Sequence, residues 1–198
     1  EIIELISNKF QHWSDGPPMR WFPLEENGHI SNVSLEYRRS ESAHICLGMP
    51  ALSDSDPDRF VLRVLNTILG DGMSSRLFLE LREKAGLVYT VNSEVSAFRD
   101  TGAVFIYCAT QPKNIYRSVE LILKEMAKLT LEVTEKEIRK AKEQIKGRLL
   151  LRMEDTLNTA LWIGSQELLH NRTMTPDEVT AEIDKVTPKD IAKLMESM

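Results

Sequence analysis

The sequence contains few cysteines, few aromatic residues and no long apolar run. Two of its 198 residues are cysteine, and aromatic residues make up 7%. Cys46 and Cys108 are too few for a disulfide framework or a thiolate metal site, so we expect two small buried residues in a reducing compartment. No stretch approaches the ~20 apolar residues of a membrane helix, and no basic and apolar leader opens the chain. We therefore expect no membrane span. The missing leader says little about a longer parent protein, and the expectation of a cytoplasmic location rests on the low cysteine content.

The charge of the chain excludes little else. The net charge is -5, and there is no basic run or arginine-aromatic interleaving, which argues against a nucleic-acid partner. Hydrophobic residues at 42% and charged residues at 28% are typical of a globular protein. The length is sufficient for one well-buried domain or two small subdomains.

The sequence also lacks the ligands of a zinc site. Its four histidines are His12, His29, His44 and His170, and none has a histidine partner at helical spacing. Only Glu167 and His170 place an acid and an imidazole three residues apart on an expected helix. A catalytic zinc needs three protein ligands, so we interpret this pair as a solvated helix end.

The start of the chain predicts two parts. Residues 1–10 have apolar residues at helical spacing, whereas residues 13–23 contain Gly16, Pro17, Pro18 and Pro23, which are typical of a linker. We expect residues 1–23 to be the end of a preceding domain plus a linker. Residues 24–198 would then be the following domain, in a segment truncated at both ends of a longer parent protein.

Alternating apolar residues predict four strands. Residues 33–37 and 43–49 alternate around a polar stretch, which predicts two antiparallel strands with His44 on the face opposite the apolar residues. Residues 87–98 and 103–110 flank Arg99–Gly102, which is typical of a hairpin.

Helical spacing fills the rest of the chain. We expect a helix after Asp56 as its N-cap, a helix over 115–129, and another from Thr134 that continues through 157–168. Thr175 and Thr187 begin two further helices, each with a hydroxyl cap, a proline and an acid. The fold class is therefore α+β, a largely antiparallel sheet with helices packed on one face.

Residues 69–89 combine a turn, a helix and the start of a strand. We expect Gly70 and Gly72 to end one helix in the left-handed conformation, and Ser74 or Ser75 to cap the next. A phosphate could bind at such a turn, but the G-K-[ST] ending of a nucleotide loop is missing, so capping is the better interpretation.

A third glycine lies near the end of the same stretch. Gly86 is expected to cap a short helix that carries Arg82 and Lys84 in its last turn, where cations suit the helix dipole. Tyr89 then lies just inside the following strand.

The run L-G-D-G-M-S-S-R-L-F-L-E-L-R-E-K-A-G-L-V-Y resembles the C-terminal half of the insulinase, pitrilysin and mitochondrial-processing-peptidase family of zinc metallopeptidases. The resemblance continues through Asp100–Gly102 and the two long helices, over nearly the whole chain. It implies one half of a two-half clam-shell. The family's zinc motif, H-x-x-E-H, would lie in a homologous N-terminal half and is not in this sequence.

The resemblance also implies a role for two residues. In the family, an arginine and a tyrosine seven positions apart contact the substrate carbonyl across the chamber from the zinc, and Arg82 and Tyr89 occupy those positions. On residue chemistry alone, an arginine paired with Glu80 or Glu83 and an ordinary strand tyrosine would be commoner. Arg76 is expected to brace the turn.

Two functions remain open from the sequence. The first is the substrate-binding half of a zinc metalloendopeptidase, inactive alone, with zinc bound by the rest of the parent protein. The alternative is a non-catalytic partner subunit of a heterodimeric peptidase, or a structural scaffold. Expected partners are a peptide substrate and a homologous N-terminal half or catalytic partner chain, in a dimer.

Overall fold

A computed structural model describes residues 1–14, 16–17, 22–24 and 33–198, in two compact units, Glu1–Ser31 and Asn32–Met198. The first unit holds one helix, α1 (Ile2–Phe10), without a buried residue. The ring of Phe10 lies 5.3 Å from that of Trp13. The predicted linker lies partly outside the described residues, and His29 lies wholly outside them. The assignment of residues 1–23 to a preceding domain stays a prediction.

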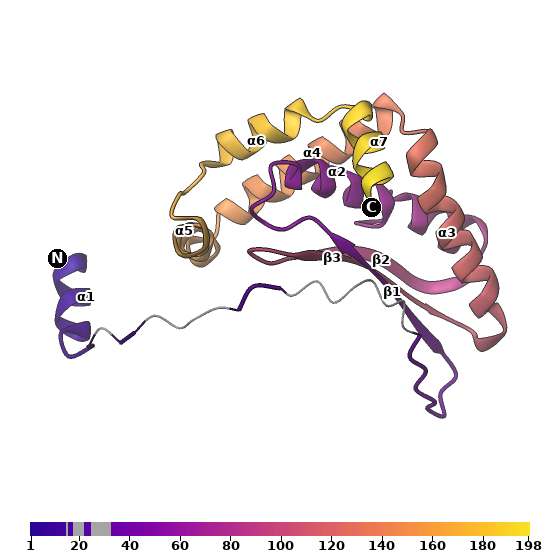
Figure 1. Ribbon diagram of the computed structural model, residues 1–198, viewed down its shortest axis with the longest axis horizontal. Helices are drawn as coiled ribbons and strands as arrows, with labels where there is room; N and C mark the ends of the chain where they lie inside the picture. Colours follow the sequence, from indigo (N-terminus) through magenta and orange to yellow (C-terminus); the bar gives the residue numbers. More distant parts are fainter. Residues whose placement is uncertain (15, 18–21, 25–32) are drawn as a thin grey trace. The chain divides into compact units, whose positions relative to one another are not determined.

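The second unit combines three strands with a layer of helices (Figure 1). In chain order its elements are β1 (Ala43–Ala51), α2 (Arg59–Leu69), η1 (Phe78–Lys84), β2 (Val88–Ala97), β3 (Gly102–Thr110), η2 (Pro112–Asn114), α3 (Ile115–Leu131), α4 (Glu135–Met153), α5 (Thr156–His170), α6 (Pro176–Lys185) and α7 (Pro188–Ser197).

The sheet is antiparallel throughout, with strand order β1-β3-β2. Val104, Ile106 and Cys108 of the central strand are buried, and the long helices lie along one side of the sheet in Figure 1. Helix α2 is buried along most of its length and contacts β2, α4 and α7. Helices on one face of an antiparallel sheet are the predicted α+β class, which is confirmed.

One of the four predicted strands does not form. Residues 33–37 have no regular structure, and Val33, Leu35 and Tyr37 are 98%, 93% and 88% exposed. The expected partner of this segment, β1, pairs with β3 instead. Alternation shows only that a segment suits a half-buried strand. Such a segment becomes a strand only when a neighbouring strand pairs with it and another layer covers one face. The described residues supply neither to residues 33–37.

The two cysteines differ, which corrects the expectation that both are buried. Cys108 of β3 is fully buried, and burial raises the pKa of its thiol to about 11. Cys46 is exposed, because β1 alternates and places every second residue on the uncovered face.

Three predicted helix starts are confirmed as capping boxes. The hydroxyl groups of Thr134, Thr175 and Thr187 each accept a hydrogen bond from the amide three residues later. The acid at that later position accepts one from the threonine's own amide in return. Each box satisfies two amide groups that a helix start leaves unpaired.

Two other helix boundaries differ from the sequence pattern. The carboxylate of Asp56 accepts from the amide of Asp58 at 2.8 Å, in a turn before α2 begins at Arg59. Asp155 ends the predicted continuous helix, because its carboxylate caps a separate helix, α5, and accepts from the amide three residues later at 2.8 Å. No side chain of α5 is buried.

The turn after α2 depends on two glycines for different reasons. Gly70 has a φ of -151°, so the expected left-handed conformation is wrong there. A Cβ atom at Gly70 would lie 2.6 Å from the backbone nitrogen of Ser93, so the close approach of β2 requires glycine. Gly72 has a φ of +115°, which L side chains rarely adopt.

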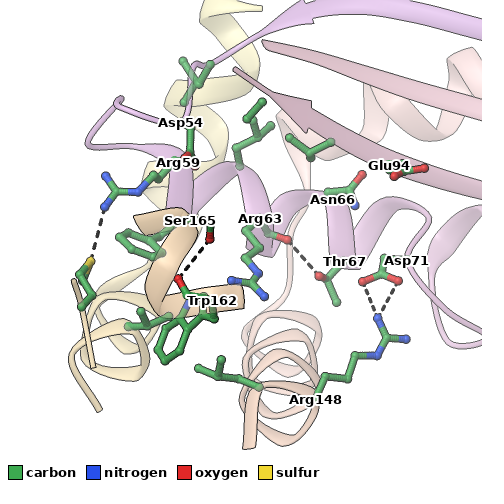
Figure 2. Close-up of a pocket in the computed structure, with 18 of the residues that line it drawn as sticks. Asp54, Arg59, Arg63, Asn66, Thr67, Asp71, Glu94, Arg148, Trp162 and Ser165 are labelled. Atoms are coloured by element: carbon green, nitrogen blue, oxygen red, sulfur yellow. Dashed lines mark hydrogen bonds and ion pairs between the residues drawn. The ribbon is translucent and has the colours of Figure 1, made fainter. Parts of the chain in front are cut away.

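Helix α4 holds this turn from the other side. The amide of Gln144 donates to the carbonyl of Asp71 at 2.6 Å. The guanidinium of Arg148 donates to both carboxylate oxygens of Asp71, at 2.7 and 2.6 Å (Figure 2). Asp71, which lies between the two glycines, is therefore fixed in place by α4.

The serine that follows does not cap a helix as predicted. The hydroxyl of Ser75 donates to the carbonyl of Gly72 at 2.7 Å, which closes the turn, and η1 starts without a side-chain cap. The first amide groups of the helix are therefore not satisfied by a capping side chain.

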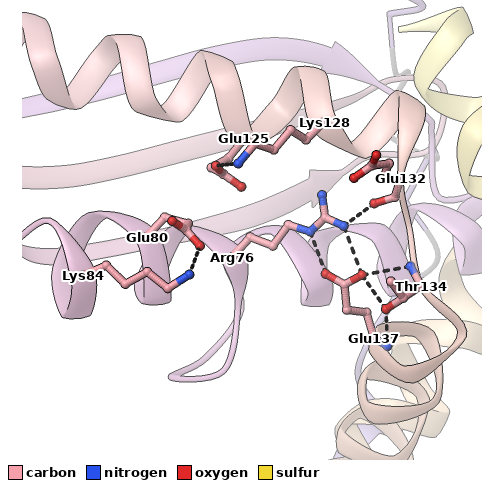
Figure 3. A network of polar contacts seen from close by, with 8 residues as sticks. All are labelled: Arg76, Glu80, Lys84, Glu125, Lys128, Glu132, Thr134 and Glu137. Atoms are coloured by element: carbon pink, nitrogen blue, oxygen red, sulfur yellow. Dashed lines mark hydrogen bonds and ion pairs between the residues drawn. The ribbon is translucent and has the colours of Figure 1, made fainter.

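Arg76 fixes the turn to the start of α4 (Figure 3). Its guanidinium donates to both carboxylate oxygens of Glu137, at 2.7 and 3.0 Å, and to the carbonyl of Glu132. Burial alone would raise the pKa of Glu137, but hydrogen bonds from Arg76 and Thr134 outweigh it and lower the pKa to about 2. The contacts of Arg76 are those of the predicted brace.

Candidate functional site

Arg82 lies in a π-helix, a form that the sequence pattern did not predict. Element η1 has hydrogen bonds between residues five apart, such as that from the amide of Ala85 to the carbonyl of Glu80 at 3.1 Å. Gly86 follows in the left-handed conformation with a φ of +58°, as expected of a helix end. Short π-helical segments are rare and occur often at functional sites.

The guanidinium of Arg82 is exposed and has no carboxylate partner among the described residues. It lies over the ring of Phe78, 4.9 Å from the ring centroid. Glu80 pairs instead with Lys84 at 2.5 Å. The alternative in which Arg82 pairs with Glu80 or Glu83 is therefore not found in the part of the chain that the structure describes.

Tyr89 lies at a break in the sheet register. Val88 and Thr90 pair with consecutive residues of β3, so Tyr89 is the additional residue of a β-bulge. Its side chain is 56% exposed. Bulges of this kind redirect a side chain and are common beside active sites.

Gln111 is a neighbour of Tyr89 that no sequence pattern predicted. The Nε2 group of Gln111, just after β3, donates to the Tyr89 hydroxyl oxygen at 3.1 Å. Because that oxygen acts as acceptor, the hydrogen of the Tyr89 hydroxyl stays available for another acceptor. The two residues are 22 positions apart and meet only through the pairing of β2 with β3.

The two predicted site residues thus lie on consecutive elements that pack together. Element η1 contacts β2, and the amide of Leu87 between them donates to the carbonyl of Leu81 at 2.9 Å. Both side chains are exposed. The catalytic role of Arg82 and Tyr89 stays a prediction.

The uncovered face of the sheet adjoins Tyr89. Its central residues include Tyr107, whose hydroxyl lies 2.7 Å from Nδ1 of His44 on the neighbouring strand. Phe105 lies on the same face, over Gly48. His44 lies on the face opposite the apolar residues of β1, as its position in the alternation predicted.

His170 is the exposed last residue of α5, as the sequence predicted, and its side chain has a partner. Its Nε2 atom lies 2.7 Å from a carboxylate oxygen of Asp54, in the loop after β1. In the described ranges, no group of three His, Cys, Asp or Glu residues could hold a metal ion. None of the described helices is long and apolar enough to cross a membrane.

Comparison with known families decides the assignment of the chain. The sequence profile described as the peptidase M16 inactive domain matches residues 1–145. The chain belongs to the peptidase M16 family. It represents the family's inactive domain, which agrees with the absence of the H-x-x-E-H motif from the sequence.

Relatives of this M16 domain are named as zinc proteases. It is 40% identical to an uncharacterized zinc protease of Streptomyces coelicolor, over 80% of this chain and 35% of that protein. It is 38% identical to an uncharacterized zinc protease of Bacillus subtilis, over 75% of this chain and 37% of that protein. The chain therefore spans little more than a third of the length of these relatives.

A solved structure shares the fold. A protease from Helicobacter pylori superimposes on the M16 domain with a TM-score of 0.84 at 17% identity. The match covers 99% of this chain and 48% of that one. At this identity the likeness establishes the fold alone.

Proposed function

We propose that this M16 domain is the substrate-holding half of a zinc-dependent metalloendopeptidase. A homologous N-terminal half, in the same polypeptide or in a partner chain, supplies the zinc and the general-base glutamate. The segment by itself is inactive. Membership of the family, the zinc-protease names of its relatives and the placement of Arg82 and Tyr89 support this division.

The proposed chemistry follows from the charge that peptide hydrolysis creates. Attack of water on the peptide carbonyl gives a tetrahedral intermediate with a negatively charged oxygen, which fixed hydrogen-bond donors stabilise. The Tyr89 hydroxyl donates its hydrogen to that oxygen, while Gln111 fixes the hydroxyl from the other side. The Arg82 guanidinium adds a positive charge and further donors.

One observation carries the proposal. Two exposed hydrogen-bond donors, on the adjacent elements η1 and β2, are still able to bind a ligand. Arg82 has no carboxylate partner among the described residues, and Tyr89 receives a hydrogen bond at its oxygen. Both stand where the backbone departs from regular structure. Such departures cost stability and persist at functional sites.

The test replaces each donor in the natural polypeptide that contains this sequence, assayed with its catalytic half. Arg82→Gln and Tyr89→Phe are expected to lower kcat by about a hundred- to a thousand-fold, the usual loss for one oxyanion donor. Bound zinc should be unchanged. Arg117→Gln and Tyr116→Phe, exposed neighbours on α3, are matched controls. Unchanged turnover in the Arg82 and Tyr89 variants would refute the assigned roles.

Zinc analysis of the natural polypeptide separates the self-sufficient peptidase from the partner subunit. About one zinc per chain is expected if the homologous half carries the ligands. A polypeptide that takes up no zinc would instead be a partner subunit that requires a second, catalytic chain. We expect a dimer in either arrangement, measurable by sedimentation.

A further inference from the structure

A cavity of about 990 Å³ lies between the helices and the sheet (Figure 2), and Tyr89 does not line it. Its walls come from α2 and the turn after it, α4, α5 and the segment that leads into α6, the loop after β1 and the second half of β2. The size matches that of sites for small organic ligands, which are about 300–1,000 Å³. Neither the proposed catalytic role nor the contacts of the turn require a space of this size.

The cavity is positively charged in an acidic protein. Five arginines and three carboxylates line it, whereas the whole chain has a net charge of -5. The carboxylates of Asp71 and Asp54 are already taken by Arg148 and His170. Arg59 donates to the carbonyl of Asp56 and lies over the ring of Phe60.

Neither Arg63 nor Arg152 forms an ion pair in the part of the chain that the structure describes. The charge of Asp71 acts on Arg63, but the carboxylate of Asp71 is bound by Arg148. Figure 2 shows Arg63 extending from α2 toward the side of the cavity where Trp162 lies. Desolvation and the nearby charge of Arg152 lower the pKa of Arg63. Two guanidinium groups that face one cavity and repel each other are a favourable site for an anion.

Apolar side chains stand beside these charges. Phe60, Met153 and Trp162 line the cavity and pack against the hydrophobic core, which holds them in place. Leu169 of α5 adds a further apolar surface. The lining therefore suits a ligand with an apolar or aromatic body as well as a negative charge.

From this arrangement we infer that the cavity binds a small organic oxyanion, a carboxylate or phosphate ester with an apolar body. Its anionic group lies between Arg63 and Arg152, and its apolar part lies against Phe60 and Trp162. Guanidinium groups bind carboxylate and phosphate oxygens through paired hydrogen bonds. The inference is independent of the proposed peptidase function, because no residue of that site lines the cavity.

The experiment measures binding of 1-naphthyl phosphate to the natural polypeptide by titration calorimetry. We expect saturable, one-site binding that weakens as salt is added. The same titration with 1-naphthoate, the carboxylate counterpart, shows whether the cavity prefers a phosphate ester or a carboxylate. Saturable binding of either anion supports the site. Neutral 1-naphthol and inorganic phosphate, each with half of the required chemistry, are expected to bind at least about tenfold more weakly.

Variants locate the ligand. Arg63→Gln and Arg152→Gln are expected to weaken binding by about ten- to a hundred-fold, and Arg63→Lys by less. Arg117→Gln, which lies outside the cavity, should leave the affinity for the ligand unchanged. If the Arg152 variant unfolds at the same temperature as the unsubstituted protein, its weaker ligand binding does not result from a loss of folded protein.

Three results would overturn the inference. The first is no detectable binding of either naphthyl anion. The second is naphthol or inorganic phosphate binding as tightly as the naphthyl anions. The third is equal weakening by Arg117→Gln and by the cavity variants.

Discussion

Arg76 and Arg82 lie six residues apart in one short segment and have opposite surroundings. The guanidinium of Arg76 is consumed by Glu137 and the carbonyl of Glu132, and its side chain is 14% exposed. Arg82 is exposed and meets only the ring of Phe78 among its described contacts. One short run of residues therefore holds both a brace that builds the fold and a donor that is not used by the described contacts of the fold.

The surrounding backbone shows the same division. The Arg76 side of the segment is fixed by regular devices, a capping box at Thr134 and a paired Asp71. The Arg82 side has a π-helix and a β-bulge. The first region therefore holds the polar contacts that fix the turn, and the exposed donors stand in the second.

The largest expected effect breaks the brace. Arg76→Met removes the partner of a partly buried carboxylate, so the free energy of unfolding of the 198-residue chain should fall by about 3 kcal/mol. Arg82→Met should change it by less than about 0.5 kcal/mol, because no ion pair is lost. Urea unfolding followed by circular dichroism measures both. Equal losses for the two variants would remove the distinction between brace and donor.

A smaller effect is expected on acidification. The pKa of Glu137 is lowered from 4.5 to about 2 in the folded chain. Its contribution to stability is therefore complete above pH 4.5 and is lost as the pH falls toward 2. Because the side chain is 30% exposed, screening leaves about 1–2 kcal/mol of the ~3 kcal/mol that the full shift would give.

Glu137→Gln serves as the matched variant for this titration. It should be less stable at neutral pH and should show a flatter dependence of stability on pH between 4.5 and 2. Urea midpoints measured across this range give both slopes. Parallel slopes in the two proteins would assign the acid sensitivity to other carboxylates.

Local patterns predicted the regular parts of this fold. The spacing of Thr134, Thr175 and Thr187 relative to their acids predicted three helix starts, because a capping box is completed within four residues. The alternation around His44 likewise predicted which face of β1 is uncovered. The strand predicted at 33–37 was wrong, because strand formation depends on a partner edge that no local pattern describes.

The candidate site was predictable only in part. Arg82 and Tyr89 were selected through a family resemblance, while the π-helix and the bulge that carry them have no signature in apolar spacing. The contact of Gln111 with Tyr89 and the presence of Arg63 and Arg152 in one cavity depend on distant segments meeting. Such contacts follow from the tertiary fold, so no window of the sequence contains them.

The smallest expected effect tests whether Gln111 belongs with the donors. Gln111→Leu removes the group that fixes the Tyr89 hydroxyl but keeps the hydroxyl itself, so kcat in the natural polypeptide should fall by only about two- to fivefold, with KM unchanged. In a Tyr89→Phe background the same change should have no effect, because no hydroxyl remains to be positioned. Steady-state kinetics of the two single variants and the double variant give the coupling. Additive losses would mean that Gln111 acts independently of Tyr89, and the donor region would then consist of Arg82 and Tyr89 alone.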